Sequence, residues 1–284
     1  MGGALHVVAV PIGNLEDITV RARRLLETAD RVACEDTRQT GRLIELLGLP
    51  KRPLVSLHDH NEADRIPGLL AAIEAGEQVA LVSDAGTPTV SDPGFKLVRA
   101  VIDAGLTVVP VPGVCAAITA LCAAGLPTDR FRFIGFVPAK GAALRTALAE
   151  VAGAAETLIF YVSPHGLDRF LAAAAEVFGV DRPAVIAREL TKKFEEFRRA
   201  TLGELVEDPG TVRGELVVLV GGAPAEAAPD ASTLEATVAL LLREGYSSSK
   251  AAREAARRTG GSRDEAYRFA IALREADESD PADE

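Results

Sequence analysis

Short apolar runs alternating with segments of helical periodicity constrain the fold of this 284-residue chain most strongly. In the first part of the chain, the apolar runs cover 5–10, 31–35, 53–57, 78–83 and 107–111. Helical spacing covers 18–28, 38–47, 62–75, 95–104 and 114–124. Short apolar strands that alternate with helices are typical of a largely parallel sheet covered on both faces. We therefore predict an α/β domain for residues 1–126.

The pattern changes after the segment GLPTDR at 125–130, which we interpret as a domain junction. Five further strands are expected at 130–137, 156–163, 183–189, 193–202 and 214–221. Helices are expected near 141–152, 166–178 and 202–207. With fewer helices between its strands, residues 127–222 are predicted to form a second α/β domain with a mixed sheet.

A small helical unit is predicted beyond an Ala/Pro/Gly-rich linker at 223–231. Capping-box patterns occur at Ser232 with Glu235 and at Ser262 with Glu265. We predict three helices with a helix-turn-helix-like arrangement over 232–276, followed by an acidic tail at 277–284.

Composition and charge argue against several classes of protein. The net charge of −10 argues against a non-specific coat on nucleic acid, which needs broad positive charge. Three scattered cysteines argue against a disulfide framework, and no apolar run is long enough for a membrane span. The N-terminus lacks the basic region of a signal peptide, so we expect a cytoplasmic protein with no membrane association.

Glycine-rich loops follow three of the predicted strands, at 11–14, 84–88 and 112–117. In open α/β sheets the carboxyl ends of the strands bind ligands, and small residues let the backbone approach a ligand closely. Each loop taken alone could equally be an ordinary turn. Neither G-x-G-x-x-G after a strand nor G-x-x-x-x-G-K-[ST] occurs, so a dinucleotide or triphosphate loop is unsupported.

Several longer motifs occur together in a specific order. They are VPIGNLEDIT, EDTR (35–38), HDHNE (58–62), LVSDAGTPTVSDPG (81–94), VPGVCAAITAL (111–121), ARELTKKFEE (187–196) and GELVVLV (214–220). From about residue 5 to 221, and again in the C-terminal helices, the chain resembles the tetrapyrrole-methylase family. The order and spacing resemble the branch of that family that acts on small-subunit ribosomal RNA.

The resemblance implies a two-domain tetrapyrrole-methylase fold, a homodimer, and S-adenosylmethionine as methyl donor, bound between the two domains. It implies 2′-O-methylation of a cytidine ribose in the decoding region of 16S ribosomal RNA, within the small ribosomal subunit. The implied donor contacts are Pro11, Asp84, Gly86, Thr87, Cys115, Ala116, Tyr161, Val162, Ala187 and Gly214. Val162 and Gly166 depart from the family pattern, in which an acidic residue and an arginine often stand there.

Candidates for accepting the proton of the ribose hydroxyl are Asp36, His58, Glu189 and Lys192. Asp36 could instead cap the following helix, and Lys192 could belong to a solvated face. His58 and His60 have the spacing H-x-H without further ligands at a usual interval, so we predict no metal site.

Candidate RNA contacts are Arg38, Lys250, Arg253, Arg257 and Arg258. Residues 247–268 carry six basic and three acidic groups on an otherwise acidic chain, which favours contact with phosphate. A stabilising appendage is the alternative for this segment. For the whole chain, the alternatives are methylation of a corrinoid precursor or of a modified protein histidine, and a non-catalytic RNA-binding assembly protein.

Overall fold

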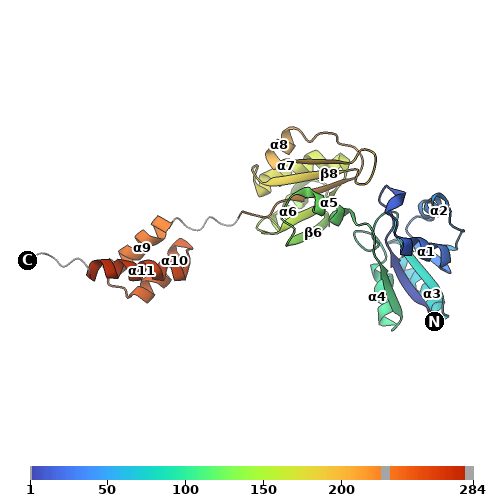
Figure 1. The fold of residues 1–284 in the computed structure, drawn as a ribbon, viewed down its shortest axis with the longest axis horizontal. Coiled ribbons are helices and arrows are strands. Elements are labelled where there is room, and N and C mark those ends of the chain that lie inside the picture. Colours follow the sequence, from blue (N-terminus) through green and yellow to red (C-terminus); the bar gives the residue numbers. More distant parts are fainter. Residues whose placement is uncertain (1, 225–230, 279–284) are drawn as a thin grey trace, which may run out of the picture. The chain divides into compact units, whose positions relative to one another are not determined.

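The computed structural model describes residues 2–224 and 231–278, which divide into two compact units, Met1–Ala223 and Pro224–Glu284 (Figure 1). The predicted linker over 225–230, the side chain of Ser232 in the first predicted capping box, and the predicted tail from residue 279 onward lie outside the described residues. No helix of the described residues is long and apolar enough to cross a membrane.

The first sheet contains five parallel strands in the order β3-β2-β4-β1-β5. The strands are β1 (Ala4–Val8), β2 (Arg31–Cys34), β3 (Leu54–Ser56), β4 (Gln78–Val82) and β5 (Thr107–Val111). The prediction of a parallel sheet is confirmed. β1 ends at Val8 instead of continuing to Val10, because Val10 leaves the sheet and forms an antiparallel bridge with Gly86.

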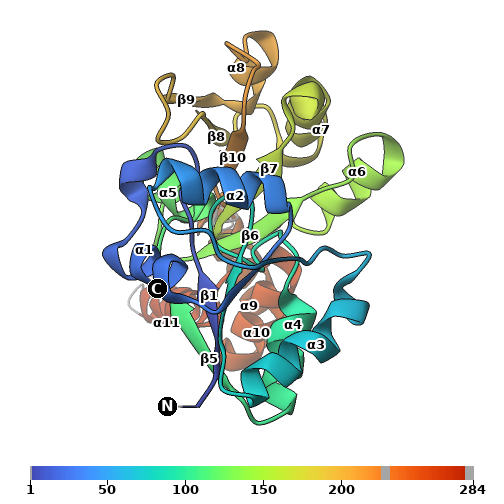
Figure 2. The same cartoon turned by 90° about the vertical axis from the view of Figure 1, so that its right-hand side faces the viewer.

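Helices cover both faces of this sheet, as its buried strands require. On one face, α1 (Val20–Thr28) and α2 (Thr37–Leu46) pack against the strands. On the other face, α3 (Glu62–Glu74) and α4 (Phe95–Asp103) lie side by side (Figure 2). α1 begins later than the sequence pattern predicts, because Thr19 caps it by accepting a hydrogen bond from Ala22 N.

The second sheet has the order β6-β7-β10-β8-β9 and is mixed: β6 and β7 are parallel and the other pairs are antiparallel. Its strands are β6 (Phe131–Phe136), β7 (Thr157–Val162), β8 (Pro183–Arg188), β9 (Glu196–Thr201) and β10 (Leu216–Val220). The helices α6 (Gly141–Ala149), α7 (Leu167–Phe178) and α8 (Leu202–Glu207) cover one face around the fully buried Phe160. Single turns of 3-10 helix occur at Leu15–Asp17 and Pro164–Gly166.

The other face of the second sheet is covered by α5 (Ala116–Ala124), although α5 directly follows the last strand of the first sheet. Its small buried residues, Ala117, Ala120 and Ala124, allow close approach to β8 and β10. Gly125 ends the helix in the left-handed conformation at φ 79°. By packing, α5 therefore accompanies the second sheet.

The second unit consists of α9 (Ala231–Arg243), α10 (Ser248–Thr259) and α11 (Arg263–Glu278). Buried Leu234, Val238 and Leu241 of α9 pack against alanines of α10 and α11. Gly260 is left-handed at φ 74° and ends α10, which allows the tight connection to α11. Glu265 N donates to Ser262 Oγ at 3.4 Å, so half of the second predicted capping box is present.

Candidate active site

Backbone and side-chain hydrogen bonds join the three predicted ligand loops at the carboxyl ends of the first sheet's strands. Val10 N donates to Gly86 O at 2.8 Å, and Gly86 N donates to Val10 O at 3.1 Å. Thr87 Oγ1 donates to Val114 O at 2.8 Å, which ties the second loop to the third. Gly86 has φ 74°, and a Cβ there would lie 3.3 Å from Ile12 Cγ2, so this crossing favours a glycine.

Tyr161 on β7 connects these loops to the second sheet. Its hydroxyl accepts a hydrogen bond of 3.2 Å from Ala117 N, in the first turn of α5. Its ring meets Phe133 and Phe136 edge to face, with centroids 5.0 and 5.5 Å away. Burial and the nearby Cys115 raise the pKa of Tyr161 well above its ordinary value, so the hydroxyl stays protonated.

A cavity of about 300 Å³ opens between the loops and the second sheet. This volume is at the lower end of the range for small-molecule sites. Its walls are mostly small or apolar, and no lysine or arginine is among the described residues that line it. The lining residues are Ile12, Ala85, Gly86, Thr87, Val90, Ser91, Asp92, Cys115, Ala116, Phe136, Tyr161, Val162, Ser163, Pro164, Leu190, Gly214, Glu215, Leu216 and Val217.

Most of the predicted donor contacts line this cavity. They are Gly86, Thr87, Cys115, Ala116, Tyr161, Val162 and Gly214. Pro11, Asp84 and Ala187 lie outside the lining. Pro11 is buried beside it, and Ala187 is fully buried against α5. Asp84 is exposed and accepts a hydrogen bond of 3.1 Å from Asp36 N, so it joins two loops. The assignment of all ten residues to donor binding stays a prediction.

The two positions that depart from the family pattern have different surroundings. Val162 is buried and lines the cavity. Gly166 lies outside the lining, in the single 3-10 turn before α7, and a Cβ there would meet nothing within 4 Å. Only the departure at Val162 therefore changes the wall of the cavity.

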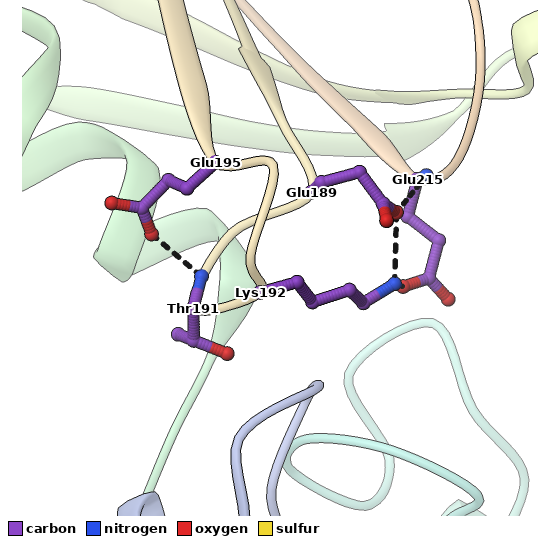
Figure 3. A network of polar contacts seen from close by, with 5 residues as sticks. All are labelled: Glu189, Thr191, Lys192, Glu195 and Glu215. Carbon is purple, nitrogen blue, oxygen red and sulfur yellow. Dashed lines mark hydrogen bonds and ion pairs between the residues drawn. The ribbon is translucent and has the colours of Figure 1, made fainter.

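Glu189 and Lys192 lie close together (Figure 3), next to Leu190 and Glu215, which line the cavity. Lys192 Nζ donates to Glu189 Oε1 at 2.9 Å and to Glu215 Oε2 at 2.7 Å, and Glu215 N donates to Glu189 Oε1 at 3.1 Å. These contacts lower the pKa of Glu189, chiefly through the Lys192 hydrogen bond. Although burial opposes it, hydrogen bonds to Glu215 and Glu189 raise the pKa of Lys192. Both groups are therefore charged at neutral pH.

Two glycines make this arrangement possible. A Cβ on Gly13 would overlap the aliphatic part of the Lys192 side chain, which crosses that loop. A Cβ on Gly214, at φ 85°, would overlap the Glu189 carboxylate. Glu189 and Thr191 also adopt positive φ angles of 50° and 65°, and Thr191 N donates to Glu195 Oε2 at 2.6 Å (Figure 3). This turn shortens β9, which begins at Glu196 and not at 193 as the pattern predicts.

Asp36 caps α2 and holds Arg38. Its Oδ1 accepts hydrogen bonds from Arg38 N at 2.8 Å and Nε at 3.1 Å, and its Oδ2 accepts one from Arg38 Nη2 at 2.7 Å. Hydrogen bonds from the Arg38 side chain and backbone lower the pKa of Asp36 to about 2. Neither residue lines the cavity. The capping role that the sequence suggested for Asp36 is confirmed.

His58 also lies outside the cavity lining, in the loop before α3. Asn61 closes this loop: its Oδ1 accepts from His58 N at 2.8 Å, and its Nδ2 donates to Ser56 O at 3.2 Å. Glu62, only 2% exposed, accepts from Leu97 N at 3.1 Å and so caps α4. The HDHNE motif therefore has a structural function that the sequence analysis did not assign.

Asp92 is a lining residue that the sequence analysis missed. It lies in the loop between β4 and α4 beside Ser91, which has a positive φ of 64°. Burial, together with the nearby carboxylates of Glu35 and Asp84, raises the pKa of Asp92 to about 6. The sequence does show Asp92 as a second acidic residue in the segment SDAGTPTVSDPG. Whether its side chain faces the cavity depends on how that loop folds back, which the sequence pattern does not predict.

In the second unit, the four predicted RNA contacts lie exposed on α10. Two of them are engaged by an acidic neighbour: Glu254 pairs with Arg257 at 2.6 Å and with Arg258 at 2.8 Å. Among the described ion pairs, none involves Lys250 or Arg253. Lys250 and Arg253 therefore carry positive charge that no ion pair of the described residues offsets, while the single carboxylate of Glu254 is shared by Arg257 and Arg258.

The model of the family described as Tetrapyrrole (Corrin/Porphyrin) Methylases matches residues 4–206, and the RsmI C-terminal HTH domain matches residues 227–274. The chain belongs to the tetrapyrrole methylase family, and its predicted fold class is confirmed. It is similar to proteins named ribosomal RNA small subunit methyltransferase I. That of Escherichia coli O157:H7 is 46% identical over 95% of each chain. That of Pseudomonas aeruginosa is 48% identical over 95% of this chain and 97% of the relative.

Among solved structures, the uroporphyrin-III-C-methyltransferase from Thermus thermophilus is similar with a TM-score of 0.54 and 26% identity. It is matched over 78% of this chain and 95% of its own. Diphthine synthase shares the fold alone, with a TM-score of 0.59 and 16% identity. The family fold therefore serves relatives named for different substrates, so the fold by itself does not choose among them.

Proposed function

We propose that this protein is a methyltransferase that uses S-adenosylmethionine to methylate the ribose 2′-hydroxyl of a cytidine in the decoding region of 16S ribosomal RNA. The observation that carries the proposal is near-full-length identity of 46–48% to proteins named ribosomal RNA small subunit methyltransferase I. The matching C-terminal helix-turn-helix domain supports an RNA substrate. Ribosomal RNA as substrate also favours a cytoplasmic location.

The cavity fits this donor chemically. S-adenosylmethionine carries a sulfonium and an ammonium charge, and no lysine or arginine among the described lining residues repels these charges. The apolar walls suit an adenine ring, while Gly86 and Gly214 let the backbone approach the ligand closely. When bound there, the donor would supply an electrophilic methyl group.

The protein's own contribution is positioning and exclusion of water. The loops are fixed to one another by the Val10–Gly86 bridge and by the Thr87–Val114 hydrogen bond. A pre-formed site of this kind lowers the entropy lost when two reactants are aligned for in-line displacement. No metal is needed for this chemistry, because the sulfonium already activates the methyl group and a neutral sulfide leaves.

Calorimetric titration with S-adenosylmethionine tests the site. Ala116→Trp fills the cavity at the start of α5 and should abolish donor binding. Ala123→Trp, on the exposed side of the same helix, is the matched control and should bind as the wild type does. Unchanged affinity in a folded Ala116→Trp protein would contradict the proposed donor site.

Transfer of a labelled methyl group to small ribosomal subunits tests the reaction. The label should appear in 2′-O-methylcytidine after digestion to nucleosides. Transfer to a corrinoid precursor or to a protein histidine, with none to RNA, would overturn the proposal in favour of another substrate. Donor binding or RNA binding without any transfer would favour a non-catalytic assembly protein.

The proposal includes a homodimer, which the family resemblance implies. Large apolar side chains are exposed on α5 and β6 of the first unit, including Ile118, Phe131 and Phe136. Exposed apolar surface of this kind suits a self-complementary interface. Sedimentation that gave only monomer at micromolar concentration would contradict a dimer.

A further inference from the structure

We propose that Asp92 is the group that accepts the proton of the ribose hydroxyl during methyl transfer. This inference rests on the proposed function and names a participant that the sequence analysis did not consider. It follows from which carboxylates line the cavity and from what each of them contacts.

The four sequence-based candidates are poorly placed for this task. Asp36 and His58 lie outside the cavity lining. Lys192 Nζ is kept protonated by two carboxylates, and an ammonium has no lone pair that could accept a proton. Glu189 already accepts hydrogen bonds from Lys192 and from Glu215 N.

Two carboxylates line the cavity among the described residues, Asp92 and Glu215. Glu215 forms an ion pair of 2.7 Å with Lys192, and its side chain is 73% exposed, so it faces mostly solvent. Asp92 forms no ion pair within the described part of the chain. It shares the cavity wall with Thr87 and Tyr161.

Burial and the acidic groups that face Asp92 favour its neutral form. Glu35 at the end of β2 and Asp84 at the end of β4 are acidic and raise the pKa of Asp92, whereas the Ser83 hydroxyl beside it lowers that pKa. Tyr161 on β7 is neutral at physiological pH. Burial and the two neighbouring carboxylates outweigh the Ser83 hydroxyl and hold the pKa of Asp92 at about 6, close to the value that suits a general base at neutral pH.

The step balances in atoms and charge. The bond from the hydroxyl oxygen to the methyl carbon forms as the bond from that carbon to sulfur breaks. The hydroxyl proton moves to a carboxylate oxygen of Asp92, and the electron pair of the broken bond stays on sulfur. A sulfonium and a carboxylate thus become a neutral sulfide and a carboxylic acid. A cavity with mostly apolar walls favours this loss of charge, because such walls solvate the charged reactants weakly. The proton then passes to solvent.

Asp92→Asn tests the inference, because it keeps the shape of the side chain and removes the basic oxygen. At saturating donor and small ribosomal subunits, we expect the single-turnover rate to fall about 10²- to 10⁴-fold. Calorimetric affinity for S-adenosylmethionine should stay within about threefold of the wild type. A fall in donor affinity that accounted for the whole loss would assign Asp92 to donor binding and overturn the inference, as would a rate within about threefold of the wild type.

Glu35→Gln gives a second test that leaves Asp92 in place. Removing a neighbouring negative charge should lower the pKa of Asp92. The acid limb of the rate profile, expected near pH 6 in the wild type, should therefore move to lower pH. An unmoved limb would contradict the inference.

Carbon-13 spectra of the aspartate carboxyl groups provide a readout apart from activity. The signal missing from Asp92→Asn should titrate near pH 6 in the wild type and at lower pH in Glu35→Gln. Wild-type protein that binds the donor but methylates no RNA would remove the proposed function, and this inference with it. If both the wild type and Asp92→Asn methylated RNA, the proposed function would stand and only the role of Asp92 as proton acceptor would be contradicted.

Discussion

The Lys192 ammonium and the Glu189 carboxylate are 2.9 Å apart, with side-chain exposures of 28% and 18%. The two residues are close in sequence, yet the pair connects distant loops. Lys192 also donates to Glu215, and its aliphatic chain packs over Gly13. Its geometry favours a structural role for Lys192: the ammonium keeps the Glu189 carboxylate charged and holds the Gly214–Glu215 segment at the edge of the cavity.

Lys192→Met should lower the free energy of unfolding by about 1–3 kcal/mol, since it leaves the half-buried Glu189 carboxylate without its cation. Methionine retains the apolar contact with the Gly13 loop. Lys193→Met is the matched control, because Lys193 is exposed and should change stability by less than about 0.5 kcal/mol. Urea denaturation of both variants checks the prediction. Equal stability would show that the network contributes nothing.

Glu62→Ala should destabilise the first unit by about 2 kcal/mol, because Glu62 is buried and its carboxylate caps α4 at Leu97 N. Lys96 lies 3.7 Å from the same carboxylate. Glu74→Ala, at the exposed end of the same helix α3, provides the comparison and should be nearly neutral. Chemical denaturation monitored by circular dichroism measures both. A neutral Glu62→Ala variant would show that α4 does not depend on this cap.

Asp92→Asn should stabilise the fold at neutral pH while it removes activity. The pKa of Asp92 is raised from 3.8 to about 6 on folding, so ionising this side chain opposes the folded state. This destabilisation by the ionised Asp92 is absent below pH 3.8, grows between the two pKa values, and is complete above about pH 6. We expect a gain of about 1–3 kcal/mol above pH 6 and none near pH 3.5. Denaturation curves at several pH values measure the difference. A gain independent of pH would mean that ionisation is not its cause.

Lys250→Ala and Arg253→Ala should each weaken binding to small-subunit RNA and reduce the salt slope of binding by about one. Both residues are exposed on α10 and form no ion pair within the described residues, whereas Glu254 holds Arg257 and Arg258. Arg257→Ala and Arg258→Ala should therefore have smaller effects. Arg243→Ala on α9 is an exposed control that retains the α10 surface. Filter binding at several salt concentrations makes the comparison. Similar losses for all five variants would indicate non-specific attraction.

The RNA role of the whole second unit has a separate test. Deleting residues 229–284 should leave donor binding intact, because every residue that lines the cavity lies in the first unit. It should weaken RNA binding and make that binding less sensitive to salt. Equal RNA affinity in the truncated protein would assign the second unit to stability alone.

The sequence by itself determined the order and kind of the elements. The alternation of apolar runs and helical spacing predicts the parallel first sheet and the three C-terminal helices, because side-chain periodicity is a local property of the chain. The glycine-rich loops also indicated where the cavity would form, since parallel strands place their carboxyl ends at one edge.

Only the tertiary structure decided which side chains share that cavity. The strand order β3-β2-β4-β1-β5 brings Glu35 and Asp84 together across nearly fifty residues, and α5 crosses to cover the second sheet. Asp92 enters the cavity while Asp84 turns to bond Asp36 N. No local pattern separates these two aspartates. Their directions follow from how each loop packs against distant parts of the chain, and the same packing sets the pKa of Asp92.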